Sequence, residues 1–144
     1  ENLMENSYVL CEGPCAGTPT HRYPEAGTPT AAERIERLVI EQTVAQVFGV
    51  ANCDLRRSTR GRAHVARARQ VGMYLAHVAC GLSLTDVGRV FQRDRTTVSH
   101  ACGVVEDERD DPTFDRVLEL LERAVIALLR PRHVETVRTG ALVQ

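Results

Sequence analysis

The chain has 144 residues, of which 43% are hydrophobic, and a net charge of −1 at pH 7. This length suffices for one domain with a modest core, and no apolar run approaches the roughly 20 residues that a membrane-spanning helix needs. The N-terminus lacks the basic and apolar segments of a signal peptide, so we expect a cytoplasmic protein. All 18 basic side chains are arginines. A Walker-type nucleotide site is excluded, because its loop requires a lysine.

The sequence shows no pattern typical of a metal site or an enzyme. Its five cysteines have no regular spacing, so they do not predict a disulfide framework. Cys11, Cys15 and His21 come nearest to a zinc pattern, but a fourth ligand does not follow them. No nucleophile–base pair or carboxylate pair stands at a usable spacing. We therefore expect no metal, no cofactor and no catalytic residue.

Residues 1–30 predict a disordered tail. The sequence Ala-Gly-Thr-Pro-Thr occurs at 16–20 and again at 26–30, and such turn-forming repeats bury too little apolar surface to fold. The first helix is expected to begin after Thr30, which forms a capping box with Glu33, and to end at Gly49. Its expected buried face consists of Ile35, Leu38, Val39, Ala45 and Phe48.

A short helical turn at 54–58 and a long helix at about 63–80 are expected next. The long helix ends at Gly81 and carries His77, which we expect to be exposed. Its expected buried residues are Val71, Tyr74, Leu75 and Val78.

Residues 83–101 predict a helix-turn-helix. Ser83 stands three residues before an acid, as in a capping box, and apolar residues then recur at helical spacing at 84, 87, 90 and 91. After a break, Asp94 can cap a second helix whose first turn presents Arg95, Thr96 and Thr97. In a helix-turn-helix, the start of the second helix enters the major groove of DNA. Arginine can form two hydrogen bonds to guanine, aspartate can accept one from the cytosine amino group, and a threonine methyl group can pack on thymine.

The charge distribution favours the same interpretation. Residues 55–105 contain nine arginines and two acids, whereas residues 1–54 contain three arginines and eight acids. Residues 106–122 are again acidic, with two arginines and eight acids. A basic block joined to a helix-turn-helix indicates a nucleic-acid-binding protein. The alternative is a solvated, charged surface loop.

Three sequence blocks resemble the C-terminal DNA-binding domain (domain IV) of the bacterial replication initiator DnaA. They are RARQVGMYLA at 67–76, LSLTDVGRVF at 82–91 and RDRTTVSHA at 93–101, within a resemblance that covers about residues 33–128. The resemblance implies an all-α, Trp-repressor-like domain with an embedded helix-turn-helix that binds double-stranded DNA. It also implies two anchors, the recognition helix in the major groove and an arginine of the basic loop in the minor groove.

The resemblance assigns base contacts to the start of the second helix. Asp94, Thr96 and Thr97 match positions that contact bases, and His100 matches one that supports the backbone contact. Arg95 replaces the histidine of the family, which favours guanine and a preferred sequence other than the standard box.

The basic loop and the long helix supply the remaining assigned residues. Arg67, Arg69 and Gln70 match the stretch that begins the long helix beside the phosphates. Either Arg60 or Arg62 is expected to enter the minor groove, whose negative potential attracts arginine.

The predicted organisation is a DNA-binding domain at 31–130 followed by a flexible tail at 131–144. The last helix is expected to begin with Asp111 as its cap and Pro112 at its first position. Its broad apolar face packs on the domain and also allows a homodimer. The expected face comprises Val117, Leu118, Leu121, Val125, Leu128 and Leu129, widened by Leu120 and Ile126.

Because the ATPase module of the initiator is missing, the sequence predicts DNA binding without catalysis and without a nucleotide. We expect a nucleoid-associated transcription regulator that reads DnaA-box-like sites. One alternative is a modulator or competitor of replication initiation at initiator boxes. The other is a protein-interaction module that has lost DNA binding.

Overall fold

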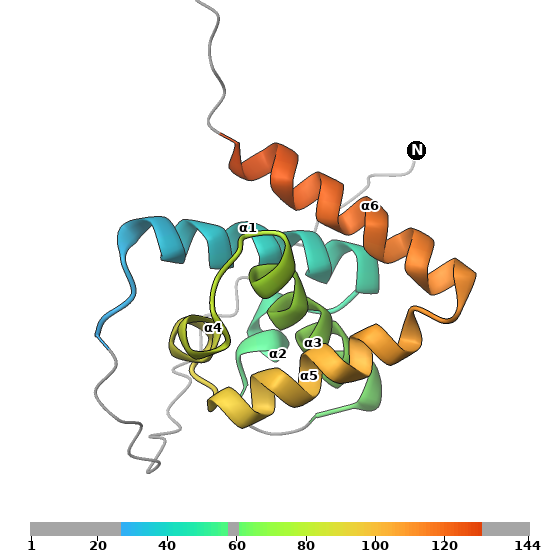
Figure 1. Ribbon diagram of the computed structural model, residues 1–144, viewed down its shortest axis with the longest axis horizontal. Helices are drawn as coiled ribbons and strands as arrows, with labels where there is room; N and C mark the ends of the chain where they lie inside the picture. Colours follow the sequence, from blue (N-terminus) through green and yellow to red (C-terminus); the bar gives the residue numbers. More distant parts are fainter. Residues whose placement is uncertain (1–26, 58–60, 131–144) are drawn as a thin grey trace, which may run out of the picture.

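The computed structural model describes residues 27–57 and 61–130, which form six α-helices and no strand (Figure 1). The predicted all-α fold class is confirmed for these residues. The helices are α1 (Ala31–Phe48), α2 (Asn52–Arg56), α3 (Ala63–Val78), α4 (Leu84–Phe91), α5 (Arg95–Glu108) and α6 (Pro112–Leu129). None of them is long and apolar enough to cross a membrane.

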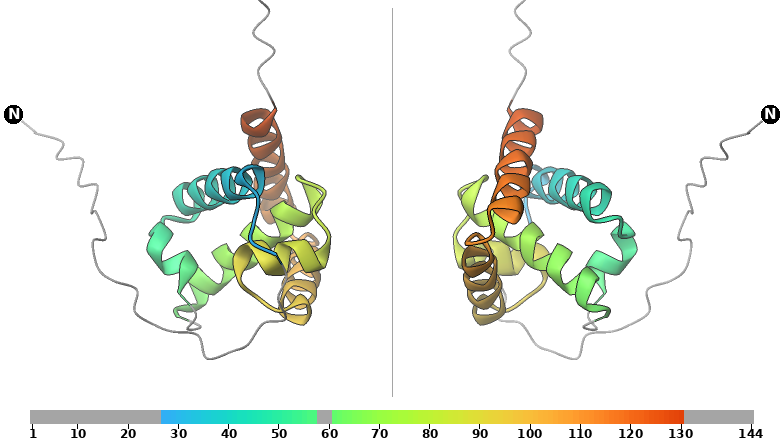
Figure 2. Two further views of the ribbon diagram at one scale, coloured as in Figure 1. Left: turned by 90° about the vertical axis from the view of Figure 1, so that its left-hand side faces the viewer. Right: turned by 90° about the vertical axis from the view of Figure 1, so that its right-hand side faces the viewer.

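Helix α3 is the centre of the arrangement. It contacts α1, α2, α4, α5 and α6, and α6 also packs on α1 (Figures 1 and 2). Most of the predicted N-terminal tail, with Cys11, Cys15 and His21, lies outside the described residues, and so does Arg60, a candidate for the minor groove. The predicted C-terminal tail also lies outside them.

Local hydrogen bonds define both ends of α1 as the sequence predicts. The Thr30 N–H donates to Glu33 Oε2 at 2.7 Å, and the Glu33 N–H donates to Thr30 Oγ1 at 3.2 Å, which completes the capping box. Gly49 follows the helix at φ 63°, a left-handed conformation that glycine adopts without a steric cost.

The predicted buried face of α1 is wrong at two positions. Ile35 and Leu38 are 58% and 54% exposed, whereas Ile40 and Val44 are fully buried. Both missed residues, Ile40 and Val44, are apolar, but they share their stripe of the helix with charged residues, so the sequence pattern favoured the neighbouring stripe of apolar residues. The buried stripe includes the charged residue Glu41, which is 3% exposed and has two arginine partners.

The middle of the chain differs from the sequence-based prediction in smaller ways. Helix α2 begins at Asn52 instead of residue 54, and α3 ends at Val78, which is exposed because the chain turns away there. Predicted burial of the other α3 residues, Val71, Tyr74 and Leu75, is confirmed. His77 is half-buried, contrary to the prediction, because its Nδ1 lies 2.7 Å from the Leu82 carbonyl oxygen in the turn before α4.

The turn between α4 and α5 is unusually tight. Gln92 adopts a left-handed conformation at φ 56°, and the Arg93 N–H donates to the Gly88 carbonyl at 2.8 Å. A Cβ atom on Gly88 would lie 2.5 Å from the Arg93 carbonyl oxygen. Only glycine therefore fits position 88 without moving the backbone that leads into α5.

Helix α6 begins as predicted, with the Asp111 carboxylate accepting a hydrogen bond from the Thr113 N–H at 2.9 Å. Its buried residues are Phe114, Leu118, Leu121 and Val125. Leu128 was expected on this face but is 61% exposed. The stripe continues instead to Leu129, which is half-buried one turn after Val125.

Replacing Gly88 by alanine is predicted to destabilise the fold by about 1–3 kcal/mol, the usual cost of forcing extra atoms into a packed position. Urea unfolding monitored by circular dichroism measures this change. Gly103→Ala is the matched control, because no atom lies within 4 Å of its added Cβ. Alanine at this position in α5 is predicted to stabilise the protein by up to about 1 kcal/mol. Equal stability of the two variants would contradict the steric argument.

Candidate nucleic-acid interface

Asp94 organises the start of α5. Its Oδ1 accepts a hydrogen bond from the Thr97 N–H at 2.7 Å, and its Oδ2 accepts one from Thr97 Oγ1 at 3.0 Å. Both bonds lower the pKa of Asp94 below its ordinary value, because they favour the charged carboxylate, and the bond from the Thr97 backbone N–H has the larger effect. The predicted N-cap is thus confirmed, and the cap also fixes the orientation of the Thr97 side chain.

Helix α5 has one buried and one exposed face. Val98, Ala101, Cys102 and Val105 are buried, and the helix contacts α3 and α4. The polar residues Arg95, Thr96, Thr97, Ser99 and His100 are exposed. All predicted base-reading residues therefore lie at the accessible, N-terminal half of one helix, as major-groove recognition requires.

The structure separates the two arginines that were predicted to act together at the start of α3. Residues two positions apart point to nearly opposite sides of a helix. Arg67 Nη2 lies 2.7 Å from Glu108 Oε2 at the last residue of α5, and its guanidinium lies 4.5 Å from the centroid of the Phe114 ring. This ion pair is about 20 Å along α5 from the recognition residues.

Arg69 faces α2 instead. Its Nε donates to the Leu55 carbonyl at 3.0 Å, and its Nη2 donates to the Asp54 carbonyl at 2.9 Å. Burial, and then the nearby charge of Arg93, lower the pKa of Arg69 below its ordinary value. Arg69 therefore ties α3 to the C-terminal end of α2. The basic segment, residues 58–62, follows α2 and its C-cap residue in the sequence. Gln70, the third predicted residue here, is half-buried.

Arg62 occupies the N-cap position of α3 and is exposed, and its side chain makes no capping hydrogen bond. Arg57, Arg62, His64 and Arg69 line a concave surface between the end of α1 and the start of α3. Since Arg60 lies outside the described residues, the structure does not choose between Arg60 and Arg62 for the minor groove.

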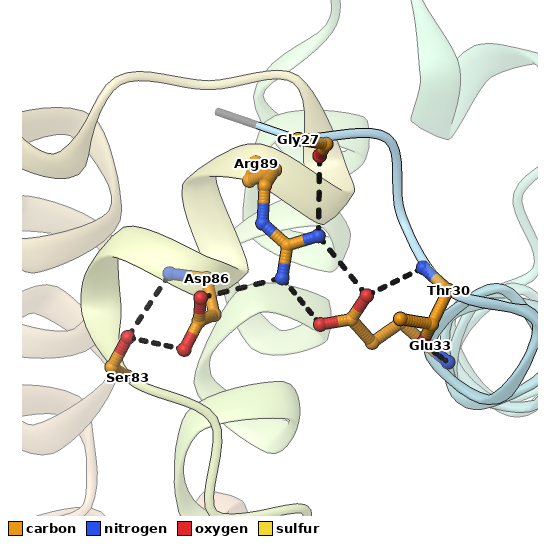
Figure 3. Close-up of polar contacts among 6 residues, drawn as sticks. All are labelled: Gly27, Thr30, Glu33, Ser83, Asp86 and Arg89. Atoms are coloured by element: carbon orange, nitrogen blue, oxygen red, sulfur yellow. Dashed lines mark hydrogen bonds and ion pairs between the residues drawn. The ribbon is translucent and has the colours of Figure 1, made fainter. Parts of the chain in front are cut away.

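Helix α4 is held against the start of α1 by Arg89. Its guanidinium pairs with the carboxylates of Glu33 and Asp86 and donates to the Gly27 carbonyl at 3.4 Å (Figure 3). The Ser83 hydroxyl accepts from the Asp86 N–H at 3.1 Å, so the predicted N-cap is confirmed. The Asp86 carboxylate accepts from the same hydroxyl at 2.6 Å rather than from the Ser83 backbone N–H. This cluster fixes the first helix of the helix-turn-helix on the domain.

Sequence reasoning missed the residues that hold the interface in place, namely Arg37, Glu41, Arg56, Arg89 and Arg93. The available signals were the i, i+4 spacing of Arg37 and Glu41 and the i, i+3 spacing of Asp86 and Arg89 in expected helices. Their other partners are far away in sequence, such as the Val90 carbonyl that accepts from Arg37 at 2.6 Å.

Comparisons with known proteins agree with this geometry. Residues 38–105 match the family described as the bacterial DnaA protein helix-turn-helix. The chromosomal replication initiator protein DnaA of Bartonella quintana is 42% identical over 96 residues, covering 65% of this chain and 19% of that protein. Residues 38–105 belong to the DnaA helix-turn-helix family. This region of DnaA is domain IV, a DNA-binding domain, and the ATPase module is absent from the aligned region.

Other DnaA proteins give a similar result. DnaA of Symbiobacterium thermophilum is 38% identical over 95 residues, covering 65% of this chain and 20% of that protein. A crystal structure of a DNA replication initiation factor has a TM-score of 0.62 and 31% identity, over 68% of this chain and 30% of that chain. The structure of a replication initiator DnaA bound to AMPPCP and single-stranded DNA has a TM-score of 0.60 and 31% identity, over 67% of this chain and 30% of that chain. The chain spans about a fifth of the length of the curated DnaA relatives it matches.

The Glu33–Arg89 pair predicts a pH-dependent stability. Hydrogen bonds from Arg89, and then from Thr30, hold the pKa of Glu33 at about 2, below the model-compound value of 4.5. Because the pKa of Glu33 is lower in the folded than in the unfolded protein, its charged carboxylate stabilises the fold fully above about pH 4.5. This stabilisation is lost as the pH falls toward 2. Urea unfolding of wild type and Glu33→Gln is predicted to differ more at pH 6 than at pH 3. A constant difference would show that the carboxylate charge contributes nothing.

Proposed function

We propose that this protein is a sequence-specific double-stranded DNA-binding transcription regulator that acts without catalysis on DnaA-box-like sites, in the cytoplasm at the nucleoid. The observation that carries the proposal is the exposed polar start of α5, capped by Asp94 and mounted on a buried apolar face. The membership of residues 38–105 in the DnaA helix-turn-helix family supports the same function.

We assign base reading to the first turn of α5. Arg95 donates two parallel hydrogen bonds to a guanine, and Thr96 and Thr97 contact neighbouring bases. The Thr97 hydroxyl is oriented by Asp94, whose carboxylate can also accept a hydrogen bond from a cytosine amino group. His100, one turn along the same exposed face, supports the contact with the DNA backbone.

We assign the second anchor to the basic segment and α3. Arg60 or Arg62 enters the minor groove. Arg67 and Gln70 contact phosphates, and Arg67 would exchange its ion pair with Glu108 for a phosphate. Arg69 contributes to phosphate binding through the position of α2, because its guanidinium holds two α2 carbonyls.

The two alternatives make different predictions. A modulator or competitor of replication initiation binds the same DNA, so only its effect at initiator boxes in the cell distinguishes it from a regulator. A protein-interaction module predicts no sequence preference for DNA at moderate salt.

DNA binding can be measured by fluorescence anisotropy with a DnaA-box duplex, a scrambled duplex and a sequence selected from a randomised pool, across a range of salt concentrations. We predict tighter binding to one sequence, with an affinity that falls as salt rises because counterions are released. Arg95→Ala should cost about 1–3 kcal/mol and relax the preference at one base pair. Arg116→Ala is the control, since Arg116 lies on α6 in an ion pair with Glu119. Equal, weak binding to all duplexes would contradict the proposed function.

We further propose that the protein forms a homodimer through α6, as helix-turn-helix proteins that bind paired half-sites do. The proposal is supported by Leu120, Ile126 and Leu128, which remain exposed after α6 has packed on α1 and α3. Light scattering at increasing protein concentration is predicted to show a mass approaching twice 15.9 kDa. Leu120→Glu/Leu128→Glu should return the mass to that of a monomer. A monomer mass for the unmodified protein at high concentration would remove the dimer.

A further inference from the structure

A hydrogen bond joins the turn of the helix-turn-helix to the basic segment. Arg93 lies between α4 and α5, and its Nη2 donates to the Arg57 carbonyl at 2.6 Å. Arg57 is the C-cap residue of α2, and the basic segment follows it directly. Residues 36 positions apart are thus in contact, and the bond joins the turn before α5 to the C-terminal end of α2.

The chain is held firmly on both sides of this bond. On the recognition-helix side, the Arg93 N–H donates to the Gly88 carbonyl, and the Arg93 carbonyl packs so closely on Gly88 that an added Cβ would lie 2.5 Å from its oxygen. On the other side, the Arg57 N–H donates to the Asp54 carbonyl at 3.4 Å, and Arg69 holds the carbonyls of Asp54 and Leu55. The Arg93–Arg57 bond thus connects two chain segments that are each held by further hydrogen bonds, and it fixes the turn before α5 relative to the end of α2.

The guanidinium groups of Arg69 and Arg93 approach the same end of α2. Arg93 is close enough to Arg69 to disfavour the charged form of that arginine. The carbonyl oxygens of Asp54, Leu55 and Arg57 offset this repulsion, because each accepts a hydrogen bond from one of the two guanidinium groups. Two arginines therefore converge on the C-terminal end of α2.

We propose that Arg93 is a positioning residue for DNA recognition, which sets the spacing between the recognition helix and the minor-groove arginine. This inference rests on the proposed function. Two elements that enter adjacent grooves bind together only if their separation matches the DNA, and a separation fixed before binding removes an ordering cost. Arg93→Lys keeps the positive charge but removes the planar guanidinium and shortens the side chain, so we expect it to weaken the bond to the Arg57 carbonyl.

The test is a double-mutant cycle between Arg93→Lys and the removal of both minor-groove candidates, Arg60→Ala/Arg62→Ala. Anisotropy measures binding to the selected duplex and to the scrambled duplex. On the wild-type background, Arg93→Lys should weaken binding to the selected duplex by about five- to tenfold, within the range of coupling between interacting residues. On the background without Arg60 and Arg62, the same change should cost less than about twofold. Binding to the scrambled duplex and its salt dependence should stay unchanged.

Arg95→Lys is the matched control, because Arg95 is an exposed arginine two positions away. Its effect should be the same on both backgrounds. Hydrogen–deuterium exchange of the free protein provides a second readout that needs no DNA. Arg93→Lys should increase exchange of the amides at 55–57 and 61–65, while amides in α6 and the urea midpoint remain close to wild type.

Three results would overturn the inference. The first is an equal effect of Arg93→Lys on both backgrounds. The second is an equal loss of binding to both duplexes in Arg93→Ala with a salt slope lower by about 0.9, which is the behaviour of a simple phosphate contact. The third is unchanged exchange at 55–57 and 61–65. If the wild-type protein itself shows no sequence preference, the proposed function fails and this inference fails with it. If the wild-type protein prefers one DNA sequence but any of the three results is observed, only this inference fails.

Discussion

The buried carboxylate of Glu41 is the contact on which the rest of the structure depends. It lies 2.7 Å from Arg37 Nε and 2.7 Å from Arg56 Nη2, so one charge joins α1 to α2. Arg37 also donates to the Val90 carbonyl and lies over the Phe91 ring, which extends the connection to the end of α4. Loss of one partner of a buried ion pair is costly, because the remaining charge stays out of water. The positions of α2 and of the first helix of the helix-turn-helix therefore depend on one cluster of charged side chains.

Arginine donating to a backbone carbonyl is the recurring device of this fold. Arg37 reaches the end of α4, Arg69 reaches the end of α2, and Arg93 reaches the residue after α2. The chain uses arginine for every basic position. Several arginines that contribute to the basic charge of residues 55–105 thus act within the protein. The exposed basic charge is therefore smaller than the sequence count suggests, and among the described residues it includes Arg57 and Arg62 as well as Arg95 at the start of α5.

The DnaA helix-turn-helix is retained here with a different side chain at a proposed reading position. Arg95 is exposed next to the cap residue Asp94, where it is free of the packing that constrains Val98. The proposed change of the preferred base requires only this longer, permanently charged side chain and no change in the fold.

The sequence by itself determined the elements whose chemistry is local. The caps at Thr30, Ser83, Asp94 and Asp111 follow from hydrogen bonds between residues two or three positions apart, and the DnaA motif follows from contiguous blocks. Only the tertiary structure decided which face of α1 is buried and where the arginines point. Arg37 and Val90 are 53 positions apart, and Arg56 and Glu41 are 15 positions apart. Glu41 has one local partner in Arg37, but its burial also depends on Arg56 from another helix, and no local pattern contains that second contact.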